Sequence, residues 1–441
     1  MLEILDILRP ALGAPSFANM MVIFAGWVLT PGRHAVTEAL VQTRVSGHRH
    51  HEAFHRFFSR ARWTADRLGL AVFLAIRPWA GATLRIAIDD TLAPKKGPHV
   101  HGIGCHLDAA RSTRRFKVFS FGHCWVVLAV LVAVPFSDRR WALPVLFRLY
   151  RNKSTSSKGE YRKKTQLARE MLATLLAWAP DERVELAADS AYCCREVLRD
   201  EPERLIVFGS MPTNAALYDP PPAAQRRRKG RPAKRGKRKP TLEKMASNPR
   251  LPWQTCTANL YGELQQIHYK SLLCLWPTVC GERLLHVVLV RCDTGARRLR
   301  VYFSSDFRVS VVQLLEGYSL RWAIEVCFRD LKQHFGFADS SARSEKAVRR
   351  TAPFVGLAYC LLIHWFASSA EARKNAVLPL RPWYPHKRGF SFLDVLAAAQ
   401  SDLRPVDFRA KVPPTRPTRK SRRPRPGTKP PPANRAIARA A

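Results

Sequence analysis

Four side chains of the segment 317–337, GYSLRWAIEVCFRDLKQHFGF, fall on one face of the helix that the segment predicts: Tyr318, Arg321, Glu325 and Lys332. An α-helix turns about 100° per residue, so these spacings keep the four within an arc of roughly 60°. The remaining positions are mostly apolar, and the helix should therefore be largely buried. Because buried charge needs a partner or a function, this stripe of one acid, two bases and a phenol predicts a functional site.

Acidic residues are scarce in the chain, 34 against 73 basic ones, so their placement is informative. Asp89 and Asp90 end one predicted strand, 83–89, and Asp189 ends another. Adjacent strand ends would bring Asp90 and Asp189 together, and a helix across those ends would add Glu325. Carboxylates are the ligands that Mg²⁺ prefers, and two such ions about 3.5–4 Å apart can support phosphodiester cleavage.

Periodicity does not choose firmly between Asp89 and Asp90. Successive side chains of a strand face opposite ways, so only one can point at the site; we favour Asp90 and keep Asp89 as the alternative. A purely structural interpretation is also open, because Asp is common in turns and helix caps. Arg321 and Glu325 would then be a surface pair worth a few tenths of a kcal/mol. That interpretation leaves Tyr318 and Lys332 unexplained.

The elements that must position these residues indicate an α/β fold. Strands are predicted at 83–89, 116–134 and 141–149, a helix at 161–178, and strands at 183–189 and 204–210. The three early strands can pair antiparallel, whereas the later ones need crossover helices and run parallel. By fold-level analogy, this mixed sheet with flanking helices is ribonuclease-H-like. The stripe helix is expected to start at a capping box of Ser310 and Gln313 and to end at Gly336.

The chain is expected to divide into five segments. They are a helical DNA-binding domain at 1–78, the first part of a catalytic core at 79–210, a β-rich insertion with a basic loop at 211–303, the last part of the core with C-terminal helices at 304–404, and a basic disordered tail at 405–441. The tail is assigned from its Pro and Arg content.

The spacing Tyr-x2-Arg-x3-Glu-x6-Lys resembles the YREK signature of bacterial insertion-sequence transposases, which carry a DDE catalytic triad. The segments IDDTLAPKKG and ADSAYCCREVL are similar to the first-Asp and second-Asp segments of that group, and 302–344 is similar to its third-acid region. The resemblance covers about 80–370 well, including a β-rich insertion before the Glu. It fits the N-terminal helices more loosely.

The resemblance implies a DDE transposase that binds insertion-sequence ends and catalyses metal-dependent DNA strand cleavage and strand transfer. Asp90, Asp189 and Glu325 would bind two Mg²⁺ or Mn²⁺ ions. The residues that would hold DNA are Tyr318, Arg321, Lys332, Lys95, Lys96 and Arg329. The partner would be double-stranded DNA, at transposon ends and target, bound by a dimer in the bacterial cytoplasm at the nucleoid. The alternative is a related DDE nuclease, or a domesticated DNA-binding protein without transposition activity.

The net charge of +39 over 441 residues independently points to a polyanionic partner, and nucleic acid is the obvious one. Basic residues cluster at 226–239, where KGRPAKRG resembles an AT-hook core that would lie in a minor groove. A solvated flexible loop is the equal alternative. In the N-terminal region Arg60, Arg62 and Trp63 are weaker candidates for recognising DNA ends. A non-enzymatic basic architectural protein is the rival class.

Other classes fit the sequence less well. The ten cysteines contain no C-x-x-C pair, which favours reduced thiols in a cytoplasm. The apolar run 125–136 is too short to span a bilayer, so no membrane role is expected. His51, Glu52 and His55 spell H-E-x-x-H, the zinc-protease motif, but no convincing third ligand helix follows. We interpret that match as coincidence within a basic helix.

Overall fold

The structure is a computed structural model, and it describes residues 1–113, 115–156, 159–222, 233–292, 299–378, 382–383, 387 and 389–414. Over these residues the chain forms one ten-stranded sheet flanked by helices. The strand order is β2-β3-β1-β5-β6-β10-β9-β8-β7, with β4 paired to β3. The expected α/β class with a ribonuclease-H-like core is confirmed, since β4-β3-β1 is antiparallel and β1-β5-β6 is parallel.

The core strands are long, apolar and mostly buried. They are β1 (Leu84–Pro94), β2 (Gly104–Leu107), β3 (Phe119–Val134), β4 (Ser137–Tyr150), β5 (Val184–Ala188) and β6 (Leu205–Ser210). Strand β3 is buried without alternation over most of its length, as expected for a strand covered on both faces. The crossover from β4 to β5 runs through α5 (Lys164–Trp178), and the short α6 (Arg195–Leu198) lies between β5 and β6.

Strand β1 is longer than its sequence pattern predicts. The prediction ended it at residue 89, but β1 continues to Pro94 because it keeps pairing with β3 as far as Gly122. Its pairing with β5 ends earlier, at Ile88 and Ala188. Asp89 and Asp90 therefore lie inside a strand, at the point where one of its two neighbours stops.

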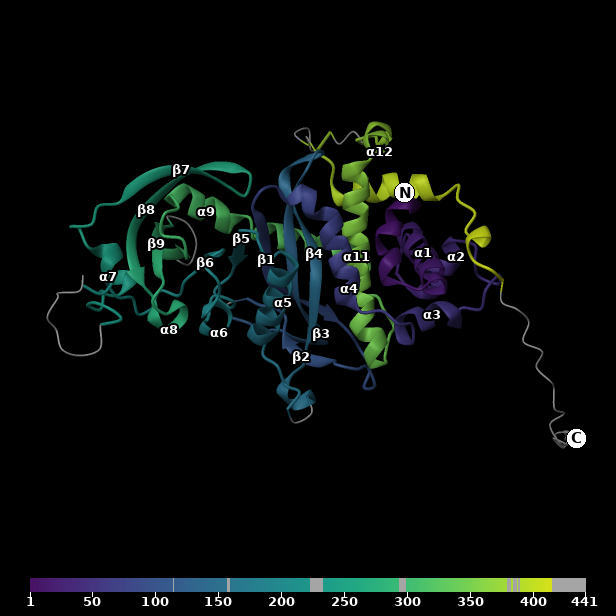
Figure 1. Cartoon of the computed structure of the whole chain (residues 1–441), viewed down its shortest axis with the longest axis horizontal. Coiled ribbons are helices and arrows are strands. Elements are labelled where there is room, and N and C mark those ends of the chain that lie inside the picture. Colours follow the sequence, from purple (N-terminus) through teal and green to yellow (C-terminus); the bar gives the residue numbers. More distant parts are fainter. Residues whose placement is uncertain are drawn as a thin grey trace, which may run out of the picture.

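The insertion continues the same sheet rather than forming a separate one. Its elements are α7 (Leu242–Ser247), β7 (Gln254–Leu260), β8 (Glu263–Leu275), α8 (Pro277–Cys280), β9 (Leu284–Arg291) and β10 (Leu299–Ser304). Strand β10 pairs antiparallel with β6, so the inserted strands extend the core sheet outward (Figure 1). Residues 223–232, which include half of the basic segment 226–239 and half of the AT-hook-like stretch, lie outside the described residues.

Helices make up the N-terminal region and most of the described chain from residue 345 to 414. They are η1 (Leu2–Ala11), α1 (Ala14–Leu29), α2 (Val36–Gln42), α3 (Glu52–Ser59), α4 (Ala65–Ile76), η2 (Arg77–Ala80), α11 (Glu345–Ser368), α12 (Ala370–Asn375), α13 (Phe392–Leu403) and η4 (Arg409–Lys411). Figure 1 shows α1–α3 on the far side of α11 from the inserted strands. The predicted tail falls outside the described residues from 415 onward.

Helix α11 forms the centre of this helical layer. By length and composition it could cross a membrane, but 89% of its most apolar window is buried inside the protein. It packs against β4, α4, α3 and α13. Its apolar sequence is therefore explained by the core that it occupies.

The N-terminal helices are fastened to the segment that follows the stripe residues 318–332. The Trp27 indole N–H donates to the carbonyl of Phe335 at 3.0 Å. The His34 backbone N–H donates to the Asp339 carboxylate at 2.8 Å. Gly336, with φ of 66°, makes the turn between these two contacts, and a side chain there would collide with His34.

The stripe predicted as one helix is two helices, α9 (Val311–Ser319) and α10 (Trp322–His334). The predicted capping box of Ser310 and Gln313 is present. The helix breaks after Ser319, whose hydroxyl donates to the carbonyl of Glu316 at 2.8 Å. The next backbone bonds span three residues, Arg321 to Tyr318 and Ile324 to Arg321, which tightens the turn.

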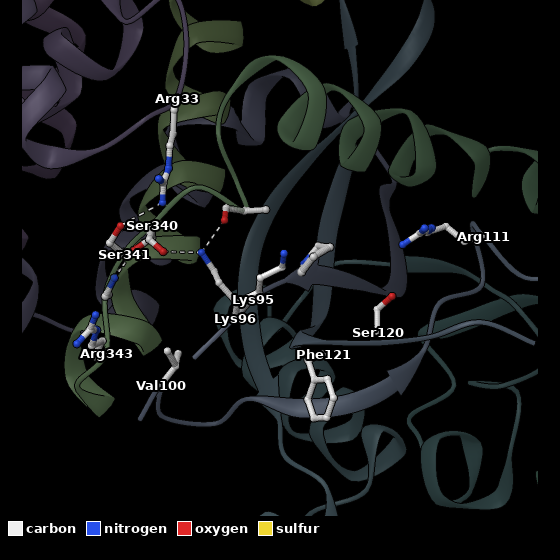
Figure 2. A pocket seen from close by; sticks show the side chains of 13 residues that line it. Arg33, Lys95, Lys96, Val100, Arg111, Ser120, Phe121, Ser340, Ser341 and Arg343 are labelled. Atoms are coloured by element: carbon white, nitrogen blue, oxygen red, sulfur yellow. Dashed lines mark hydrogen bonds between the residues drawn. The ribbon is translucent and has the colours of Figure 1, made fainter. Parts of the chain in front are cut away.

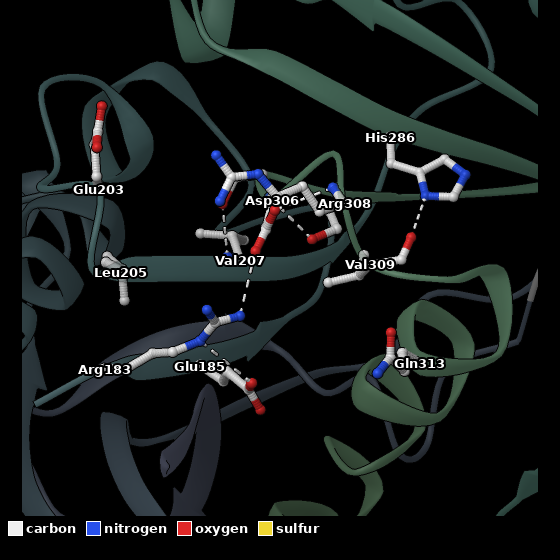
Figure 3. A network of polar contacts seen from close by, with 12 residues as sticks. Arg183, Glu185, Glu203, Leu205, Val207, His286, Asp306, Arg308, Val309 and Gln313 are labelled. Atoms are coloured by element: carbon white, nitrogen blue, oxygen red, sulfur yellow. Dashed lines mark hydrogen bonds and ion pairs between the residues drawn. The ribbon is translucent and has the colours of Figure 1, made fainter.

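Polar contacts fix the connection that leads into α9. The Arg183 guanidinium pairs with the Asp306 carboxylate at 3.2 Å, just after β10 (Figure 3). A ring nitrogen of His286, on β9, lies 2.8 Å from the carbonyl oxygen of Val309. On α9 itself, a Cβ at Gly317 would lie 2.9 Å from the Phe208 ring of β6. Glycine at this position therefore permits the close packing that places Tyr318.

Candidate active site

Two acidic residues lie side by side where the parallel pair of strands ends. The pairing of β1 with β5 finishes at Ile88 and Ala188, so Asp89, still in β1, and Asp189, just after β5, are the next residues along the chain. Neighbouring strands are about 4.8 Å apart. Consistent with this proximity, the charge of Asp189 contributes to raising the pKa of Asp89.

Arg321 joins this pair to the helical acid. Its guanidinium donates to the Asp89 carboxylate at 3.0 Å and to the Glu325 carboxylate at 2.5 Å. Arg321 is 17% exposed and Asp89 19%, whereas Glu325 is 33% exposed. The break between α9 and α10 sets this geometry, because Arg321 caps α10 and Glu325 lies on its first turn. Asp89, Arg321 and Glu325 thus form one continuous polar cluster.

Burial controls the electrostatics of the cluster. It raises the pKa of Asp89 to about 7, although the Arg321 guanidinium opposes that shift. For Arg321, burial alone would lower the pKa, but Asp89 and Glu325 hold it above its ordinary value. The Nε atom of Arg321 is buried and has no hydrogen-bond partner among the described residues. The guanidinium therefore stays charged, and its enclosed Nε is a buried donor without an acceptor among the described residues.

Asp90 points to a different set of partners. Its carboxylate accepts from Lys164 Nζ at 2.7 Å, from the Tyr192 hydroxyl at 2.8 Å and from Cys124 Sγ at 3.4 Å. Burial, together with the charge of Asp90, raises the pKa of Tyr192 above its usual range, so the phenol remains a donor. Strand alternation separates the two acids, turning Asp89 toward α10 and Asp90 toward α5.

The structure therefore connects both acids of the pair to the stripe, through different residues. Asp89 reaches Glu325 through Arg321. Asp90 is among the carboxylates near Lys332, with Asp108; desolvation lowers the pKa of that lysine and both acids oppose the shift. The link to Glu325 through Arg321 belongs to Asp89, our alternative choice, and the preference for Asp90 stays a prediction.

The chemistry of the donors fits Mg²⁺ or Mn²⁺, since all of the converging acids are carboxylates. One oxygen of Asp189 accepts from the backbone of Ala191 and Tyr192, and the other makes no hydrogen bond with any described residue. Yet within the described ranges, no three His, Cys, Asp or Glu side chains are grouped closely enough to hold a metal ion. Basic side chains are the partners of these acids in this structure: Arg321 bridges Asp89 and Glu325, and Lys164 binds Asp90.

The H-E-x-x-H match does not form a metal centre in this structure. Glu52 pairs with Arg56 at 2.7 Å, on the exposed side of α3. The rings of His51 and His55 meet edge to face, 5.7 Å apart between centroids. Both observations agree with a coincidental motif in a basic helix.

The basic residues predicted to contact DNA differ in exposure and in whether they already have hydrogen-bond or ion-pair partners. Lys95 donates to the backbone carbonyls of Ala338 and Ser340 at 2.5 Å each, and burial lowers its pKa to about 8. Lys96 is exposed and makes no hydrogen bond or ion pair through its side chain within the described residues. Arg329 is exposed and pairs with its neighbour Asp330 at 3.0 Å. Lys95 therefore already has a structural role, whereas Lys96 is available to a ligand.

The prediction that Trp63 contacts DNA is wrong. Trp63 is 2% exposed and its indole donates to the carbonyl of Phe57, so it belongs to the helical core. The Arg350 guanidinium, 4.7 Å from the centroid of the Trp63 ring, completes its packing. An aromatic residue among bases was the signal for DNA contact, but burial of that ring removes it from the surface.

A pocket of about 1450 Å³ opens beside the cluster, and the sequence analysis missed most of its wall. Ser190, next to Asp189, lines it together with Tyr261, Arg300, Tyr302, Tyr318, Arg321 and Trp322. Tyr318 contacts Tyr302 with ring centroids 4.6 Å apart, and Trp322 contacts Tyr261 at 6.0 Å. Tyr261 and Tyr302 come from the insertion, so no local pattern links them to the stripe. Lys164 and Tyr192 were missed as well, although Tyr192 lies within the ADSAY segment.

The family described as DDE superfamily endonuclease matches residues 8–265, which is more than half of the chain. The match contains Asp89, Asp90 and Asp189 and ends before Glu325. No curated protein matches this sequence.

Proposed function

The chain belongs to the DDE superfamily endonucleases, and from that premise we propose that it is a transposase that cuts and joins DNA at the ends of an insertion sequence. Family membership makes it a nuclease whose substrate is DNA. One observation carries the further step. Arg321, a member of the transposase-like YREK stripe, bridges Asp89 and Glu325 next to Asp189.

In this proposal, Asp189, Glu325 and one acid of the Asp89–Asp90 pair hold two divalent cations, Mg²⁺ or Mn²⁺. When bound, the cations supply an activated nucleophile and a stabilised leaving oxygen. The contacts of Asp89 favour it as the third ligand, whereas the family-like segment IDDTLAPKKG favours Asp90. The acid that is not a ligand holds Arg321 or Lys164 in place.

The basic residues of the cluster have distinct tasks. Arg321 offers a planar fork that suits a phosphate group, and in this structure that fork donates to the Asp89 and Glu325 carboxylates. Lys332 acts as a point charge near Asp90. Tyr318 lines the pocket beside the acids, where it would contact the DNA near the reacting phosphate.

The proposed partner is double-stranded DNA, first at the ends of the element and then at the target. Joining two ends requires two copies of the chain, so we propose a dimer in the DNA complex, acting at the bacterial nucleoid. The net charge of +39 supports the DNA-binding part.

The test is cleavage and strand transfer on DNA that carries the native ends of the element, with Mg²⁺ or Mn²⁺. Asp189→Asn and Glu325→Gln should each lower both activities by at least about 10³-fold, since each removes a metal ligand. Binding of uncleaved DNA should stay within about threefold of the unmodified protein. Glu170→Gln, the same chemical change at an exposed position on α5, is the matched control.

The comparison of Asp89→Asn with Asp90→Asn decides which acid is the third ligand. Only the ligand variant should lose activity to the same extent as Asp189→Asn, and the other should lose part of it. Normal cleavage in Asp189→Asn or Glu325→Gln would remove that residue from the site. Cleavage without strand transfer by the unmodified protein would favour a nuclease that does not transpose.

A further inference from the structure

Exposed phenyl rings gather on the hairpin of β2 and β3. Phe119 and Phe121, two residues apart on β3, are each 63% exposed, and Phe116 just before them is 69% exposed. Phe119 pairs across the hairpin with Leu107, which is 48% exposed. None of the three phenyl rings stacks on another aromatic ring among the described residues. Large apolar side chains grouped in this way mark a binding surface.

A basic pocket of about 600 Å³ adjoins this surface (Figure 2). Phe121 and Ser120 form part of its wall, and five cationic side chains form much of the rest: Arg33, Lys95, Lys96, Arg111 and Arg343. No acidic residue lines it within the described part of the chain. The side chains of Lys96, Arg111 and Arg343 are exposed and form no ion pair with a described residue. The pocket therefore offers uncompensated positive charge beside exposed aromatic rings.

The pocket is connected to the candidate active site by the same strand. Strand β1 carries Asp90 and runs on toward Lys95, roughly 16 Å further at about 3.3 Å per residue. A second connection passes through Ser120, whose hydroxyl donates to Asp108 at 3.2 Å. Asp108 and Asp90 are both near Lys332. The acids and the pocket therefore lie along one strand, close enough for a single bound DNA strand to reach both.

We propose that the pocket and the hairpin surface bind an unpaired DNA strand adjacent to the reacting phosphate, an inference that rests on the proposed function. Lys96, Arg111 and Arg343 contact the phosphates, and Phe119 and Phe121 stack on the bases. Cationic grooves with aromatic side chains are the arrangement that binds single strands without sequence preference. A duplex would satisfy the cations but not the phenyl rings, because its base faces are already stacked.

Binding measured in EDTA tests this site without any cleavage. The probes are a fluorescent 20-nucleotide single strand and a blunt duplex of the same sequence. The double variant Phe119→Ala/Phe121→Ala should bind the single strand at least about tenfold more weakly, with less than about twofold change for the duplex. Phe121→Trp should retain single-strand binding, since it keeps a stacking surface. Phe307→Ala, an exposed phenyl at a distant position, is the control.

A single strand with abasic positions separates stacking from charge. It should bind the unmodified protein about as weakly as the normal strand binds the double variant. Equal loss of single-strand and duplex binding in the double variant would overturn the proposal, as would undiminished binding of the abasic strand. These outcomes are independent of the proposed function, which is tested by cleavage in Mg²⁺. Cleavage can fail while single-strand binding persists, and the reverse also holds.

Discussion

The pair Asp89 and Asp90 shows at the scale of single residues what sequence can and cannot decide. The pattern IDDT predicts a pair of acids, Asp89 and Asp90, of which only one points toward the site. Which one depends on where β5 stops and on which helix faces each side, and both are tertiary facts. The structure also adds Lys164 and Tyr192, whose contacts with Asp90 have no local sequence signal.

The ion pair of Arg321 with Asp89 predicts how much a substitution of this arginine destabilises the fold. Arg321→Ala removes the cation from the mostly buried Asp89 carboxylate, and we expect a loss of roughly 2–3 kcal/mol in the free energy of unfolding at pH 8. Because burial raises the pKa of Asp89 to about 7, the loss should shrink below that pH as the carboxylate takes up a proton. Urea unfolding at pH 8 and pH 5.5 measures both values.

The double variant Arg321→Ala/Asp89→Asn serves as the control, since it has no buried charge left at this position. Its stability should recover at pH 8 and should lose the pH dependence of the single variant. A single variant as stable as the unmodified protein at pH 8 would show that the Asp89–Arg321 pair contributes nothing to folding.

At the scale of elements, prediction succeeded where the signal was local. The strands near 184–188 and 205–210, the helix near 164–178 and the capping box at Ser310 follow directly from hydrophobic period and cap chemistry. The break between α9 and α10 was missed because a single hydroxyl, that of Ser319, competes for a backbone carbonyl. The true end of β1 was missed because it depends on pairing with β3.

Buried His123 on strand β3 predicts how the stability of the fold depends on pH. His123 is 3% exposed, and burial, aided by Lys95, lowers its pKa to about 4. The unfolded chain has an ordinary histidine pKa near 6.5, so it binds the proton more tightly than the folded chain. The resulting stability is present above pH 6.5 and should be lost as pH falls toward 4, by up to about 3 kcal/mol.

Thermal unfolding between pH 7.5 and pH 4.5 measures this dependence. His123→Gln should flatten the curve, although other buried histidines keep some slope. His99→Gln, in an exposed loop, should follow the unmodified protein. A curve for His123→Gln that overlays the unmodified one would contradict the assignment.

At the scale of the whole molecule, the insertion was predicted as a β-rich unit, and its strands instead extend the core sheet through β10 and β6. Non-local pairing of this kind has no sequence signature. The total charge, by contrast, follows directly from composition and supports a prediction about binding.

DNA affinity should fall by at least about 10³-fold between 50 and 200 mM salt, because a protein with a net charge of +39 displaces many counterions from DNA. Fluorescence anisotropy with duplex DNA over this range gives the slope. Removing residues 415–441, which carry nine of the basic residues, should reduce the slope without abolishing binding. An affinity independent of salt would exclude the electrostatic contribution.

The contacts of Trp27 with Phe335 and of His34 with Asp339 have a mechanical consequence. They tie the amino-terminal helices to the chain immediately beyond α10, whose other end bears Glu325. A duplex bound by those helices would therefore lie at a fixed distance from the Glu325 carboxylate. The length of α10 would then determine how far the cleaved phosphate lies from the DNA sequence bound by those helices.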